Sequence, residues 1–139
     1  MSIADPISPA FALVYSTLHG DATLMAQISG VYQDIAPAVT YTKPYITFQL
    51  QSATDTNTAT AVRMLTRLIL TVKIIAQAKD GAAQRSAFAR ADALLCPNGQ
   101  PLRLQGGTLA LYRTGVISYS EIDSGIQYVH LGGLYRAEV

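Results

Sequence analysis

Charge is scarce in this chain. Ten Lys and Arg and nine Asp and Glu make up 14% of its 139 residues, and the formal net charge is +1; an average domain has about 25%. The cationic residues are dispersed, with no Lys or Arg run. Because a duplex-binding protein displaces phosphate counterions with clustered Lys and Arg, this pattern argues against a dedicated nucleic-acid binder. The shortage of charged residues favours a subunit whose surface is partly covered by other subunits over a well-packed monomer.

Residues that build catalytic and metal sites are also few. The single cysteine, Cys96, excludes an internal disulfide, and no CxxC, HxxxH or paired-carboxylate spacing is present to hold a metal. His19 and His130 lie far apart in the chain, and we expect each to be structural or solvated. Gly106-Gly107 lacks the further glycines and the lysine of a phosphate loop. We therefore expect no enzyme: no catalytic residue, no cofactor and no metal.

Long uncharged apolar runs are missing as well. The most apolar stretch, residues 62–79, contains Arg67 and Lys73, so it does not fit a membrane span, and no membrane partner is expected. Asp5 and Pro6 precede any apolar run, which is unlike a signal peptide. We expect synthesis and assembly in the cytoplasm of the producing cell.

Alternation of apolar and polar residues predicts the strands. Residues 62–79 alternate with period two, which is typical of a strand with one buried face. The residues of that face are Leu68, Leu70, Val72, Ile74 and Ala76. Tyr45–Gln51, Leu109–Ser120 and Ile126–Glu138 are expected to be further long strands, the last two joined by a turn at 123–125. Short strand candidates lie at 31–33 and 102–104.

Helical spacing and capping residues predict three helices. The first covers 10–19 after Ser8-Pro9 as cap and first turn, the second covers 22–29 with Asp21 as cap, and the third covers 81–96 with Asp80 as cap. On the third helix, the residues expected to face outward are Gln84, Arg85, Arg90 and Asp92.

These elements predict one domain, residues 1–139, of the α+β class. The expected order is helix-helix-strand-strand-helix-strand-strand. Consecutive strands joined by hairpins make a mostly antiparallel sheet, and helices on one face of it make a two-layer sandwich.

A polar stretch, SATDTNTATA at 52–61, joins two of the strands. It has no large apolar residue, so it is expected to be a mobile loop in the free subunit. A hairpin tip without function is one interpretation. The other is an assembly interface that a partner orders, formed by Thr54, Asp55, Thr56, Asn57 and Thr58.

Several short motifs follow one another in a familiar order. They are Leu18-His19-Gly20-Asp21, Gly30-Val31-Tyr32, Ala36-Pro37, Pro44-Tyr45-Ile46-Thr47-Phe48 and the closing Gly133-Leu134-Tyr135-Arg136-Ala137-Glu138-Val139. Together they resemble the tail-terminator or tail-completion proteins of long-tailed phages and gene transfer agents. The resemblance covers nearly the whole chain, and the proline-tyrosine-strand step is its most specific part. The threonine-rich stretch departs from it.

The resemblance implies a structural virion protein at the head-proximal end of the tail. Such a subunit forms a homohexameric ring that caps the tail tube, ends tube polymerisation and joins the tail to the head-tail connector. A head-completion or adaptor protein of the neck is one alternative, and a small-ligand-binding α+β domain is another.

The size of the chain fits a DNA-passing ring. A compact domain of this length is about 37 Å across, so six copies leave a hole of about 37 Å and four leave only about 15 Å. A duplex about 20 Å wide needs more than four subunits. With no basic cluster, such a ring is expected to pass DNA without binding it specifically.

Overall fold

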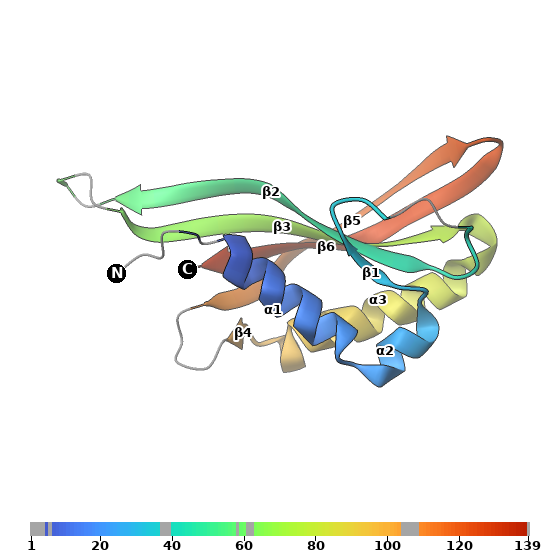
Figure 1. Ribbon diagram of the computed structural model, residues 1–139, viewed down its shortest axis with the longest axis horizontal. Coiled ribbons are helices and arrows are strands. Elements are labelled where there is room, and N and C mark those ends of the chain that lie inside the picture. Colours follow the sequence, from blue (N-terminus) through green and yellow to red (C-terminus); the bar gives the residue numbers. More distant parts are fainter. Residues whose placement is uncertain are drawn as a thin grey trace.

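The computed structural model describes residues 5, 7–36, 40–57, 59–60, 63–103 and 109–138, apart from the side chains of residues 63 and 64. Within these ranges the chain forms a six-stranded sheet in the order β1-β2-β3-β6-β5-β4, with the α-helices gathered on one face (Figure 1). The helices are α1 (Ile7–His19), α2 (Ala22–Gln27) and α3 (Gly81–Leu95), with 3₁₀ turns η1 (Ala78–Asp80) and η2 (Pro97–Gly99). The strands are β1 (Val31–Gln33), β2 (Tyr45–Asn57), β3 (Arg63–Gln77), β4 (Leu102–Arg103), β5 (Ala110–Asp123) and β6 (Ile126–Glu138).

The mixed α and β content agrees with the sequence-based expectation, and the sheet is largely antiparallel. Among the strands of the described residues, only β1 runs parallel to its neighbour, β2. Two short strands, β1 and β4, form the two edges of the sheet, at the short strand candidates predicted at 31–33 and 102–104. In the described part of the chain, no helix is long and apolar enough to cross a membrane.

Strand β3 is the centre of the core. Its five predicted inward residues are all at most 1% exposed. Four of them, all but Ala76, belong to a core cluster that includes Val14 and Leu18 of α1 and Ala87 and Ala91 of α3. Burying such apolar area is the main term that stabilises the fold. Strand β6 approaches β3 closely at Gly132, where a Cβ atom would lie 2.1 Å from the carbonyl oxygen of Val72.

Two of the three predicted helix caps need correction. Asp5, not Ser8, caps α1, since its Oδ1 accepts hydrogen bonds from the backbone N–H groups of Ile7 and Ser8 at 3.1 and 3.2 Å. Asp21 caps α2 as predicted, accepting from Leu24 N at 2.9 Å. Asp80 makes no capping bond to α3; its carboxylate instead accepts from the hydroxyl of Tyr41 at 2.5 Å.

Gln84 was predicted to face outward, and this is wrong. Its side chain is 3% exposed, and Nε2 donates to the backbone oxygens of Ile74 on β3 and Val129 on β6, at 2.8 and 2.6 Å. A buried amide is tolerated here because both of its N–H groups find strand carbonyls. Helical periodicity cannot reveal such partners, which come from distant parts of the chain.

The prediction of a mobile loop at 52–61 also needs correction over most of its length. Strand β2 continues to Asn57 and pairs with β3 back to Arg63, so most of the stretch is extended sheet. Threonine is β-branched and fits a strand even without apolar neighbours. The lack of large apolar residues therefore indicates that this stretch is exposed, not that it is unstructured. Residues 51–57 are all exposed.

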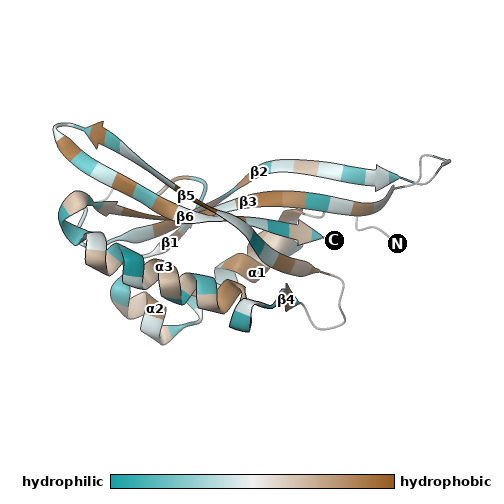
Figure 2. Cartoon of the chain, turned by 180° about the vertical axis from the view of Figure 1, so that it is seen from behind, coloured by the Kyte–Doolittle hydropathy of each residue, from teal (hydrophilic) through white to brown (hydrophobic). Residues whose placement is uncertain are grey.

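The strands give the molecule two hairpin arms. The β2–β3 arm extends from one end of the sheet and the β5–β6 arm from the other, with the helices beneath the middle (Figure 1). Seen from behind, apolar and polar residues alternate along the β5–β6 hairpin (Figure 2). Both arms extend past the segment in which β3 pairs with β6, which covers Arg67–Gln77 of β3.

Candidate functional site

Among the described residues, six large apolar side chains are exposed. Four belong to the β5–β6 arm: Val116 and Ile122 on the side toward the helices, and Tyr119 and Ile126 on the opposite side. The other two, Tyr15 and Ile35, lie on α1 and just after β1. Contiguous exposed apolar surface marks interaction sites more often than scattered single residues do.

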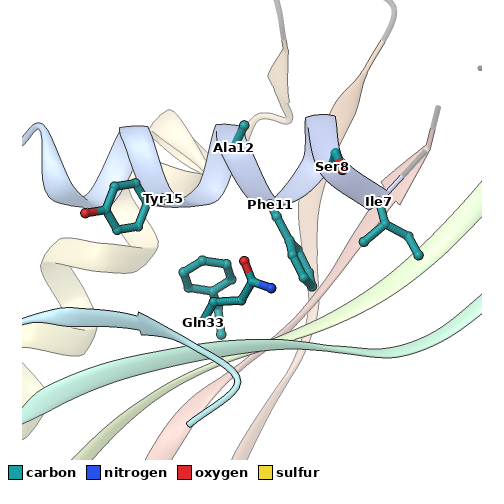
Figure 3. A pocket seen from close by; sticks show the side chains of 7 residues that line it. Ile7, Ser8, Phe11, Ala12, Tyr15 and Gln33 are labelled. Atoms are coloured by element: carbon teal, nitrogen blue, oxygen red, sulfur yellow. The ribbon is translucent and has the colours of Figure 1, made fainter. Parts of the chain in front are cut away.

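A groove lies between α1 and the edge of the sheet (Figure 3). It has a volume of about 530 Å³ and is lined by Ile7, Ser8, Phe11, Ala12, Tyr15, Gln33 and Phe48. Aromatic rings form its wall: Phe11 meets Phe48 edge to face with centroids 5.4 Å apart, and Tyr15 stacks on His19 at 5.0 Å. The lining is mostly apolar and aromatic, with Ser8 and Gln33 as its polar members, and it is suited to apolar side chains of a partner.

The face of the sheet opposite the helices carries a polar cluster. Lys73 on β3 is 9% exposed, and its Nζ donates to the hydroxyl of Tyr119 on β5 at 2.8 Å. The Tyr119 ring stacks on His130 of β6, and His130 Nε2 lies 2.7 Å from Glu121 Oε1. Together these contacts tie β3, β6 and β5 to one another from the face that no helix covers.

His130 is buried in this cluster, so the solvated alternative expected for it is excluded. It is 6% exposed, and its Nδ1 is buried without a hydrogen-bond partner. The cluster was missed from the sequence. Counting back along both strands from the turn at Asp123-Ser124-Gly125 sets Tyr119 opposite His130. The sequence could therefore have predicted the stacked pair from the hairpin register. It could not have predicted the contact with Lys73, which lies on a different strand.

Two further polar pairs join α3 to the cap of α2 and to the sheet. Arg90 on α3 donates from Nε and Nη2 to the two carboxylate oxygens of Asp21, at 2.9 and 2.7 Å. These bonds, with that from Leu24 N–H, lower the pKa of Asp21 to about 2. The Tyr135 hydroxyl donates to Asp92 at 2.7 Å, and burial raises its pKa well above the usual range.

Cys96 does not have the surroundings of a nucleophile. Burial raises the pKa of its thiol, whereas a reactive cysteine needs a lowered one. Its Sγ accepts from the backbone N–H of Arg113 at 3.0 Å. Among the described residues, no group of three or more His, Cys, Asp and Glu is placed to hold a metal ion.

The predicted interface residues lie on the β2–β3 arm. Thr54, Asp55, Thr56 and Asn57 are exposed residues of β2, and Thr58 lies outside the described residues. Asp55 Oδ1 accepts from the buried Thr66 of β3 at 2.7 Å. The structure gathers these four in one strand and brings none of them to the groove or the polar cluster.

The fold resembles that of solved proteins. One is a chain of the virion of a native gene transfer agent particle, with a TM-score of 0.65 and 18% sequence identity over 92% of this chain and 93% of that chain. Another solved protein, whose name indicates no function, has a TM-score of 0.56 and 16% identity over 96% of both chains. No family model and no curated protein matches the sequence. At these identities the likeness is one of fold.

Proposed function

We propose that this chain is a structural virion protein of a long-tailed phage or a gene transfer agent. In this proposal its homohexamer forms a ring at the head-proximal end of the tail. The ring caps the tail tube, ends its polymerisation and binds the head-tail connector protein. The observation that supports this most is a fold shared along nearly its whole length with a subunit of a gene transfer agent virion. The motifs that resemble tail-terminator proteins point the same way.

The surface of the subunit supports an assembly role. Exposed apolar residues lie on the β5–β6 arm and around the α1 groove, and the two arms extend from opposite ends of the sheet (Figure 1). A monomer would leave these surfaces in water, whereas a ring buries one against the other. The low share of charged residues, 14%, also fits a subunit with much covered surface.

Such a ring would pass DNA without holding it. The formal charge of +1 and the dispersed cations give little counterion release. Arg67 and Arg136 also share one carboxylate, that of Glu138, at 3.5 and 3.4 Å. We expect no binding of a 30-base-pair duplex at physiological salt at submicromolar protein. Submicromolar binding would contradict the role of a passive conduit.

Native mass spectrometry and electron microscopy test the proposal. The purified chain should form a hexamer, and virions produced without it should have overlong tails. Free tails beside filled heads would point instead to a neck adaptor. A stable monomer at all concentrations would contradict both roles.

A small-ligand-binding domain is the second candidate. A polar hollow of about 270 Å³ on the helix-free face is lined by Gln49, Gln51, Thr71, Lys73, Ile117, Tyr119 and Leu134. A monomer that binds a small anion there would favour this function.

A further inference from the structure

Strand β5 has an apolar side that its own subunit does not cover. Its register with β6 sets Val116 opposite Gly133 and Ile122 opposite Gln127, which places both on the face where Leu111 is buried. Yet Val116 is 53% and Ile122 is 77% exposed, because the hairpin rises away from the helix layer (Figure 1). Between them the same face carries only Ser118 and Ser120, which are small enough for another layer to approach.

In the described part of the chain, most of the outer edge of β5 has no strand partner either. Strand β4 pairs with it only at Leu111 and Ala110. From Tyr112 to Asp123, no strand in the described part of the chain pairs with this edge. A long edge without a partner is a template for another strand.

A second strand edge without a full partner lies on the opposite side of the sheet, along β2. Strand β1 pairs with β2 only from Ile46 to Phe48, and beyond Phe48 no described strand pairs with the outer side of β2. The apolar groove is at this place, since Gln33, the last residue of β1, and Phe48 both line it. Figure 3 shows Phe11 pointing down from α1 into the groove and Gln33 rising toward it from β1.

We propose that the β5 edge of one copy pairs with the free β2 edge of the next copy, and that Ile122 enters the α1 groove beside Phe48. The side chains lie on the correct face for this, because the apolar side of β5 and Phe48 both face the helix layer. Main-chain hydrogen bonds along the edges then supply affinity, and the groove supplies specificity. This inference rests on the proposed function, whose ring it explains.

The placement of the two surfaces dictates the type of assembly. Strands β2 and β5 lie on opposite sides of the central pair β3 and β6, so one copy contacts two different neighbours with two different surfaces. Such heterologous contacts close into a ring or continue as a filament; they do not form a two-fold dimer.

Substitutions on the two faces of one hairpin test the contact. Ile122→Asp places a charge in the groove, and we expect native mass spectrometry to show monomers where the wild type forms rings. Ile126→Asp is the matched control: it lies on the same hairpin, is also exposed, and points to the other face. It should leave the ring intact. The circular dichroism spectra of both variants should match that of the wild type, because neither side chain is part of the core.

Cysteine cross-linking tests the geometry directly. In a Cys96→Ala background, a Gln33→Cys protein is mixed with an Ile122→Cys protein and oxidised. We expect a disulfide-linked dimer of the two variants, and none with Ile126→Cys.

The possible outcomes distinguish this contact from the proposed function on which it rests. Rings that survive Ile122→Asp and yield no cross-link overturn this contact but leave the proposed ring standing. A wild-type chain that stays monomeric overturns both.

Discussion

Tyr119 and His130 lie opposite each other across the β5–β6 hairpin, with their rings stacked at 4.4 Å between centroids and 12° between planes. Through the Tyr119 hydroxyl the pair reaches Lys73, so the root of the arm is joined to the central strand on the helix-free face.

We predict that Tyr119→Phe and Tyr119→Ala separate the two parts of this arrangement. The phenylalanine keeps the stack and removes the partner of Lys73, and should cost about 0.5–1.5 kcal/mol of unfolding free energy. The alanine also exposes His130 and should cost more. Urea denaturation measures both; equal losses would show that the stack contributes nothing.

The buried side of β3 sets a second prediction. Leu70 is fully buried, so Leu70→Ala should lower the free energy of unfolding by about 2–5 kcal/mol. The neighbouring Thr71 faces the other way and donates only to the exposed Gln51, at 3.3 Å. Thr71→Ala should cost about 1 kcal/mol or less. Equal losses in thermal melts would mean that the face is assigned wrongly.

Gln84 provides a third test. Gln84→Leu keeps most of the side-chain volume but leaves the carbonyls of Ile74 and Val129 without this donor, and should cost about 1–3 kcal/mol. Arg85→Ala, one residue along on the exposed side of α3, should change stability by less than about 0.5 kcal/mol. A Gln84→Leu variant as stable as the wild type in denaturant titration would contradict the role assigned to the amide.

The pair Asp21–Arg90 makes stability depend on acid. The folded pKa of Asp21 is lowered from 3.8 to about 2, so the folded state favours the charged carboxylate. Its contribution is complete above pH 3.8 and is lost as the pH falls toward 2. Asp21→Asn should therefore flatten the fall in stability between pH 4 and pH 2, measured by chemical denaturation. Asp123→Asn, at the exposed hairpin turn, should keep the wild-type profile.

The β2–β3 arm stays a predicted assembly interface. Thr54→Glu with Thr56→Glu adds charge on exposed strand positions and should change stability by less than about 0.5 kcal/mol per site. If the arm binds the tube or the connector, the yield of infectious or transducing particles should fall. An unchanged yield would contradict the interface.

The sequence predicted the long strands and the buried face of β3 because alternation is a local signal. It failed where the deciding partner lies far along the chain. The amide of Gln84 finds carbonyls on two strands, and Asp80 binds Tyr41 instead of capping its helix. The threonine-rich stretch misled for another reason: its residues are stabilised by pairing with β3 rather than by burial. The groove was invisible because Phe11 and Phe48 come from an early helix and a later strand.

The arrangement of the two arms gives the assembly a direction. In a cyclic ring every copy has the same orientation relative to the axis, so its two ends are not equivalent. Within each copy the arm at one end of the sheet carries threonine hydroxyls, from Thr54 and Thr56, while the arm at the other end carries the carboxylates of Glu121 and Asp123. If the proposed ring joins a tube to a connector, each of these two unlike structures could recognise a different end, and a single gene product would suffice for a junction that cannot be inserted upside down.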